Sequence, residues 1–79
     1  MSLSAVIITR NEAARLPACL ASLAFADETV VLDNGSTDGT PQLARSLGAQ
    51  VTEVTDWPGF GPQKNRAAAL ATGDWILSI

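Results

Sequence analysis

The residues best placed to do chemistry follow an apolar run at residues 30–32. The run ends on Asp33 and passes into a polar turn that contains Gly35 and Gly39. In an α/β protein this pattern delivers a carboxylate to the carboxyl edge of a parallel sheet, where such folds bind ligands. The carboxylate of Asp33 could accept a hydrogen bond from a uracil imide or a ribose hydroxyl. It could equally cap the turn that follows, and the residue types leave both roles open.

Two other polar segments are expected at the same edge. Residues 9–12 (Thr-Arg-Asn-Glu) follow the first apolar run, and they could bind a ligand or cap the helix after them. Lys64 falls in the first turn of a predicted helix, where free backbone N–H groups and the helix dipole favour an anion such as pyrophosphate. An ordinary surface lysine is the alternative. Trp57 and Phe60 could line this cleft or cover the edge of the sheet.

The strands that must position these residues follow from the apolar pattern. Runs without alternation at residues 5–8 and 29–32 predict strands covered on both faces. Residues 50–54 alternate, which predicts a strand nearer the sheet edge, and residues 75–79 predict a last strand. Residues 56–61 are rich in Gly and aromatic side chains, which predicts a loop.

Three helices are expected between these strands. An apolar stripe over residues 16–23 predicts the first. Thr40 is expected to cap a second helix that Gly48 ends, and Pro62 to open a third that Gly73 ends. The order βαβαβαβ predicts an α/β fold, a Rossmann-like parallel sheet with helices on both faces.

Composition and missing motifs narrow the function. The 79 residues suit one small domain, and a net charge of −3 with scattered basic residues argues against a nucleic-acid partner. The chain has no histidine, which excludes Ser-His-Asp triads and His-ligated metals within it. It also lacks the phosphate loop of P-loop NTPases and the glycine fingerprint of NAD-binding domains. Neither a signal peptide nor a transmembrane helix is predicted.

Four segments, in order along the chain, carry a family resemblance. They are Val-Ile-Ile-Thr-Arg-Asn-Glu (6–12), Asp-Asn-Gly-Ser-Thr-Asp-Gly-Thr (33–40), Gly-Pro-Gln-Lys-Asn-Arg-Ala (61–67) and Ala-Thr-Gly-Asp-Trp-Ile-Leu (71–77). Together they resemble the amino-terminal half of a family 2 glycosyltransferase of GT-A fold. Residues 57–65 look most like a bacterial branch that adds glucose or a similar sugar to the lipopolysaccharide inner core.

The resemblance implies a nucleotide-sugar site but assigns no catalytic residue and no metal ligand to this chain. Asp33 would hold the base, and the other site residues would surround the nucleoside and phosphates. The full set is Thr9, Arg10, Asn11, Glu12, Asp33, Gly35, Ser36, Lys64 and Asn65. Many family members carry an aromatic residue where this chain has Arg10, so base stacking at that position is not implied.

The resemblance also implies properties of the intact enzyme. It would transfer a sugar from a nucleotide donor, a UDP-sugar, with inversion to a glycan or lipid-linked acceptor such as lipopolysaccharide core, using Mg²⁺ or Mn²⁺. It would be cytoplasmic, at most peripheral to the inner face of the membrane. Residues 1–79 would be the nucleotide-sugar-binding half, ending before the acidic metal-binding motif. Alone, this half is expected to be inactive and to self-associate through exposed strand edges.

Two other functions remain open. A nucleotidyltransferase would need a glycine-rich basic loop after the first strand, and residues 9–12 contain no glycine. A non-enzymatic binding module of flavodoxin or receiver type would have a complete sheet and would be stable at this length.

Overall fold

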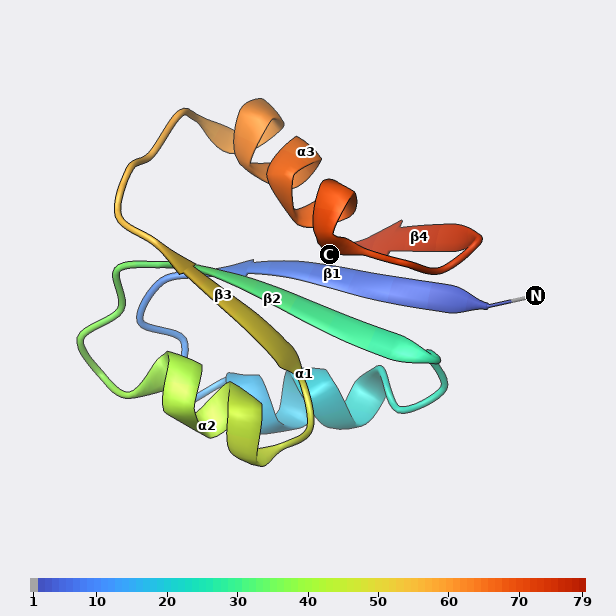
Figure 1. Ribbon diagram of the computed structural model, residues 1–79. Coiled ribbons are helices and arrows are strands. Elements are labelled where there is room, and N and C mark those ends of the chain that lie inside the picture. Colours follow the sequence, from blue (N-terminus) through green and yellow to red (C-terminus); the bar gives the residue numbers. More distant parts are fainter. Residues whose placement is uncertain (1) are drawn as a thin grey trace.

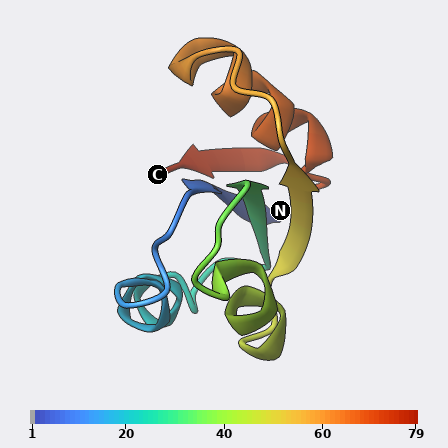
Figure 2. The ribbon, with the colours of Figure 1, turned by 90° about the vertical axis from the view of Figure 1, so that its left-hand side faces the viewer.

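A computed structural model describes residues 2–79 as a three-layer α/β arrangement (Figure 1). The strands form one parallel sheet in the order β3-β2-β1-β4. Helices α1 and α2 cover one face of the sheet and α3 covers the other (Figure 2). The elements are β1 (Leu3–Thr9), α1 (Leu16–Ser22), β2 (Glu28–Asn34), α2 (Thr40–Ser46), β3 (Gln50–Val54), α3 (Phe60–Leu70) and β4 (Trp75–Ser78). The predicted fold class and element order are confirmed.

The middle of each central strand is apolar because both of its faces are covered. Ile7 and Val31 pack in the cluster beneath α1 and α2. Val6, Val30 and Leu32 pack on the opposite face against α3. Successive side chains of a strand point to opposite faces, so a strand buried on both sides shows no polar alternation. The apolar patterns of β1 and β2 therefore come from the two layers of helices.

Strand β2 extends further than its apolar run suggests. The predicted strand stops at Leu32, whereas the parallel ladder continues to pair Asp33 with Thr9 and Asn34 with Val54. Both polar residues therefore belong to the strand and point to opposite faces of the sheet. Because of this alternation, Asp33 lies on the face covered by α1 and α2, and Asn34 lies on the face covered by α3.

The helix boundaries differ from the predictions at two starts and one end. Thr40 is the first residue of α2 and does not cap it, since Gly39 occupies the cap position at φ 83°. Helix α3 begins at Phe60, two residues before Pro62, because a proline is tolerated within a first turn. It ends at Leu70 instead of running on to Gly73. Gly48, at φ 92°, follows the end of α2 as predicted.

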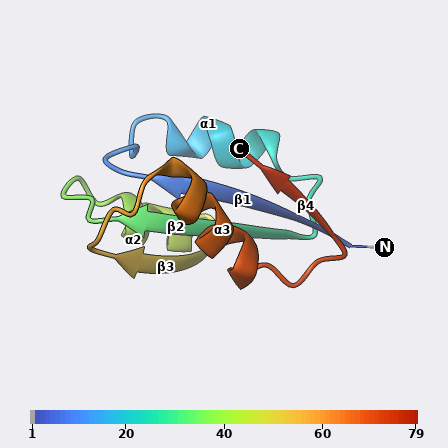
Figure 3. The ribbon, with the colours of Figure 1, turned by 90° about the horizontal axis from the view of Figure 1, so that it is seen from above.

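Strands β3 and β4 form the two edges of the sheet (Figure 3), and the side chains on these edges differ. Strand β3 lies at one edge, where Glu53 forms an ion pair with Arg45. Strand β4 lies at the other edge, and all of its residues are exposed, including Ile76 and Leu77. An apolar, uncharged edge strand is prone to pair with another chain. Among residues 2–79, no helix has the length and apolar character needed to cross a membrane.

Candidate functional site

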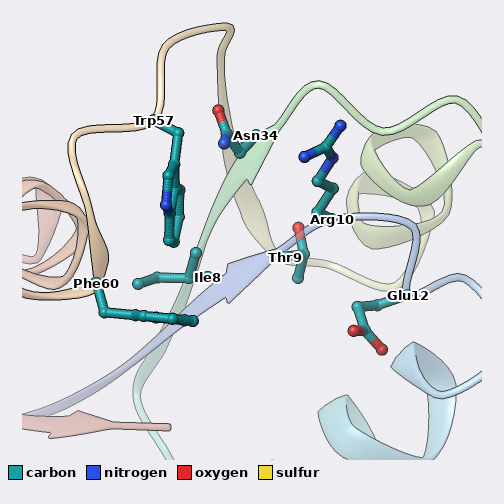
Figure 4. Close-up of a pocket in the computed structure, with 7 residues that line it drawn as sticks. All are labelled: Ile8, Thr9, Arg10, Glu12, Asn34, Trp57 and Phe60. Atoms are coloured by element: carbon teal, nitrogen blue, oxygen red, sulfur yellow. The ribbon is translucent and has the colours of Figure 1, made fainter.

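A pocket of about 280 Å³ opens at the carboxyl ends of β1 and β2 (Figure 4). Residues from β1 and the loop after it form one side, and the segment before α3 together with the first residue of α3 forms another. The lining residues are Ile8, Thr9, Arg10, Glu12, Asn34, Trp57 and Phe60. This is the edge where open parallel sheets bind their ligands.

Trp57 and Phe60 give the pocket an aromatic wall. Their ring centroids lie 5.0 Å apart, with the ring planes perpendicular. In Figure 4 both rings stand beside the side chain of Ile8, and Arg10 and Glu12 lie on the other side of the view. An exposed aromatic face next to an aliphatic side chain can hold a flat ring such as a nucleotide base, since every base has a π-face to stack.

Asn34 supplies an unused hydrogen-bond acceptor in the pocket lining. Its side chain is buried, and among the described residues its Oδ1 has no hydrogen-bond partner. Buried polar atoms are nearly always paired, so an orphaned acceptor at a pocket is a place for a ligand N–H. Asn34 was not among the site residues predicted from the sequence. The continuation of β2 through residue 34 is the signal that would have found it, because alternation then places Asn34 on the α3 face with Leu32.

Asp33, the residue first selected from the sequence, is fully buried beside the pocket instead of lining it. Its carboxylate accepts hydrogen bonds from the Thr9 hydroxyl at 2.6 Å, from the Ser36 hydroxyl at 2.6 Å and from the Ser36 N–H at 3.0 Å. These contacts are the turn-capping role that the residue types left open. They fix the turn through Gly35, which has φ 73°. Contact between Asp33 and a base stays a prediction.

The loop after β1 is held to the turn after β2 by a set of hydrogen bonds. The Asn11 N–H donates to the Ser36 hydroxyl at 2.8 Å, and the Asn11 side-chain oxygen accepts from the Thr37 N–H at 2.7 Å. The Glu12 N–H donates to the Thr40 hydroxyl at 3.0 Å. These bonds make a rigid frame on which Arg10 and Glu12 reach the pocket.

Asp38 completes this frame. Its carboxylate accepts from the Thr40 hydroxyl, from the Thr40 N–H and from the Ala13 N–H. These hydrogen bonds, the Thr40 hydroxyl foremost, lower the pKa of Asp38 below its ordinary value. Asp38 therefore links the two loops as an ionised carboxylate at neutral pH.

The predicted site residues thus fall into separate groups. Thr9, Arg10 and Glu12 line the pocket. Asn11, Gly35 and Ser36 belong to the loops beside it and do not line it. Lys64 and Asn65 are exposed on α3, outside the pocket lining. The prediction that Lys64 lies in the first turn is wrong, because α3 begins at Phe60 and Lys64 is its fifth residue. Within residues 2–79, no group of three or more His, Cys, Asp or Glu side chains could hold a metal ion.

Comparisons with known proteins agree on one family. The model described as "Glycosyl transferase family 2" matches residues 4–79. A TPR repeat-containing protein of Synechococcus elongatus is 49% identical over 78 residues, which cover 96% of this chain and 19% of that protein. The lipopolysaccharide core biosynthesis glycosyltransferase LpsC of Rhizobium meliloti is 37% identical over 83 residues, covering 100% of this chain and 31% of LpsC.

Solved structures give the same result for the fold. Glucosyl-3-phosphoglycerate synthase of Mycobacterium tuberculosis, in complex with Mn²⁺, UDP and glucosyl-3-phosphoglycerate, superposes with a TM-score of 0.80 at 32% identity. The match covers 99% of this chain and 32% of that one. The chain therefore spans between a fifth and a third of the length of these relatives.

Proposed function

Because the chain belongs to glycosyl transferase family 2, we propose that its pocket binds the nucleoside of a nucleotide-sugar donor. The observation that carries the proposal is the pairing of an aromatic wall with an unpartnered acceptor in one pocket. A uracil ring stacked on Trp57 would present its imide N–H to Oδ1 of Asn34. The mycobacterial neighbour, which holds UDP, supports uridine as the nucleoside.

The remaining lining residues suit the polar parts of such a donor. Arg10 is exposed at the pocket and forms no ion pair among the described residues. Its guanidinium can pair with a phosphate in a bidentate manner. Glu12 can accept hydrogen bonds from ribose hydroxyls. Lys64, an exposed residue of α3, stays in the proposal as a second basic contact to the diphosphate.

The reaction we propose for the intact protein is transfer of a sugar from a UDP-sugar to a glycan acceptor with inversion. The described residues include no pair assigned as acid and base, so we assign them donor binding and no catalytic step. The mycobacterial neighbour holds Mn²⁺, whereas residues 2–79 offer no cluster of ligands for a cation. A divalent metal used by the intact enzyme would need ligands in addition to those that residues 2–79 offer.

For the acceptor we propose lipopolysaccharide core. Similarity to LpsC along the whole chain supports this choice, as does the segment at residues 57–65. That segment includes the aromatic wall, so the residues that carry the finer resemblance are also residues of the pocket.

Calorimetric titration of UDP, CDP and GDP tests the nucleoside site. We expect UDP to bind most tightly, and Asn34→Ala to weaken UDP binding by about tenfold, the effect of losing one hydrogen bond of about 1.4 kcal/mol. Gln42→Ala is the matched control, since it removes an exposed amide from α2, away from the pocket. Equal UDP affinity for Asn34→Ala and the parent chain would refute the assignment of Asn34. Equal affinity for all three nucleotides would refute uracil recognition.

A further inference from the structure

The segment between β3 and α3 carries Trp57, yet few contacts hold it. Residues 55–59 form no helix or strand. Among the described residues, the polar side-chain contact between this segment and α3 is an ion pair between Asp56 and Arg66. The two N–H groups of the guanidinium donate to the two carboxylate oxygens, Nη1 to Oδ1 at 3.1 Å and Nη2 to Oδ2 at 2.6 Å.

Gln63 supports the guanidinium from the protein side. Its side chain is fully buried, and its Oε1 accepts a hydrogen bond from Nη1 of Arg66 at 3.3 Å. Exposed ion pairs usually contribute little because two mobile side chains must be ordered. A bidentate pair backed by a buried amide loses less freedom, because the buried partner already orients the guanidinium. This pair lowers the pKa of Asp56, chiefly through the hydrogen bonds from Arg66.

The position of the pair gives it a role beyond the surface of α3. Asp56 directly precedes Trp57, and Arg66 lies on the helix that begins at Phe60. One ion pair therefore joins the backbone on either side of the aromatic wall. If it breaks, no other polar side-chain contact to α3 within residues 2–79 keeps residues 55–58 beside the helix.

We propose that Arg66 and Asp56 are positioning residues that hold Trp57 against Phe60 and so maintain the aromatic wall of the pocket. The effect on donor affinity rests on the proposed function, whereas the placement of Trp57 does not. The matched control is the other short ion pair, Arg45 to Glu53 at 3.0 Å, which joins α2 to β3 and lines no part of the pocket.

The experiment measures the solvent accessibility of Trp57 directly, without a ligand. The chain has two tryptophans, so Trp75→Phe leaves Trp57 as the single reporter. In that background, quenching of Trp57 fluorescence by acrylamide is measured for Arg66→Gln, for Asp56→Asn and for both together. Arg45→Gln is the control, and far-ultraviolet circular dichroism checks that each variant is folded. UDP affinity is then measured for the same proteins.

We expect each single change at the Asp56–Arg66 pair to raise the quenching constant about twofold and to weaken UDP binding about fivefold, the effect of losing an ion pair at the favourable end of the exposed range. The double variant should be no worse than either single one, because the two residues act through one contact. Arg45→Gln should change neither value.

The outcomes separate the two proposals. Unchanged quenching in both Arg66→Gln and Asp56→Asn would overturn the positioning role, as would additive effects in the double variant. Increased quenching in a protein that binds no UDP would uphold the positioning of Trp57 and refute the proposed donor site.

Discussion

The two ends of the β1–β2 ladder use the same pair of groups for different purposes. At the amino end Ser4 lies opposite Glu28, and at the carboxyl end Thr9 lies opposite Asp33. In each pair the hydroxyl donates to the carboxylate, at 2.8 Å and 2.6 Å respectively. The groups around each pair differ: at the amino end they join separate strands, and at the carboxyl end they lie beside a pocket.

At the amino end, Glu28 gathers distant segments. Its carboxylate also accepts from the Gln50 side chain at 3.1 Å, from the Thr72 N–H at 2.8 Å and from the Thr72 hydroxyl at 2.9 Å. One carboxylate thus ties β1, β2, β3 and the turn before β4 together. At this end the acceptor is fully used and the chain closes around it, so this network serves stability.

At the carboxyl end, the hydrogen bonds leave a pocket open beside the strands. Within the described part of the chain, Asp33 accepts hydrogen bonds from Thr9 and from Ser36 in its own turn. Its neighbour Asn34 keeps a free acceptor beside a pocket. A binding site needs hydrogen-bonded side chains that hold a neighbouring unpaired polar group in position. The unpaired group can then bond to a ligand. The same cross-strand pair of a hydroxyl and a carboxylate therefore joins strands at one end of the sheet and supports the pocket at the other.

The largest loss of stability is expected when the Asp33 carboxylate is removed. Asp33→Ala leaves the buried Thr9 hydroxyl and the partly buried Ser36 N–H without their acceptor. We expect the free energy of unfolding to fall by about 3 kcal/mol, the cost of stranding buried donors. Urea denaturation followed by circular dichroism measures this loss. The control Asp74→Ala removes an exposed carboxylate and should change stability by about 0.5 kcal/mol or less. Equal losses in the two variants would mean that the hydrogen bonds to Asp33 contribute nothing to stability.

Gly73→Ala tests how tightly the amino end closes. A Cβ atom at Gly73 would lie 2.5 Å from Oγ and 2.9 Å from the backbone N of Ser4, so the turn before β4 would have to move. We expect stability to fall by about 2 kcal/mol, the usual cost of forcing extra atoms into a packed site. Gly61→Ala is the control, because its Cβ meets nothing and its backbone is helical. A thermal melt in which both variants match the parent would show that the amino end has room to spare.

Glu28→Gln should have the smallest effect, and it should depend on pH. Hydrogen bonds from Thr72, Ser4 and Gln50 hold the pKa of Glu28 below its ordinary value of 4.5. A carboxyl whose pKa is lower in the folded state adds stability above the unfolded pKa and loses it as the pH falls through the folded pKa. Near neutral pH we therefore expect Glu28→Gln to melt about 5 °C lower than the parent.

Melting temperatures measured from pH 7 to pH 2 check this prediction. The gap between the parent and Glu28→Gln should narrow as the pH falls below 4.5, because the parent then loses the same ionised acceptor. Asp38 and Asp56 also have lowered pKa values, so both proteins should still lose stability in acid. A gap that is constant over the whole range would mean that the charge of Glu28 contributes nothing.

Most of the fold follows from local pattern. The apolar runs in β1 and β2, the alternation in β3 and the stripe in α1 each predict the element that forms. Errors fall at boundaries such as Thr40 and Pro62, where the residue types permit more than one first position. The strand order was beyond local pattern. That β4 pairs with β1 and not with β3 depends on how the chain crosses the sheet.

The site was predicted less completely than the fold. Thr9, Arg10 and Glu12 follow a recognisable strand and do line the pocket. Asp33 and Asn34 are adjacent polar residues, and the residue types alone do not show which of them lines the pocket. The end of β2 at Asn34 decides it, because it places the two side chains on opposite faces. Lys64 was predicted in the first turn of a helix opened by Pro62. Because α3 begins at Phe60, Lys64 lies beyond that turn, and it is not part of the pocket lining.

By itself the sequence determined the order of the elements, the double covering of the sheet and the edge at which polar residues gather. These properties depend on periodicity and on residue type, which are local. Only the tertiary structure decided that Asp33 is enclosed while Asn34 faces a pocket, and that an ion pair from α3 holds Trp57 there. The reason is physical: burial and pairing depend on which segments, far apart in the chain, meet across the sheet, and no short stretch of sequence encodes that meeting.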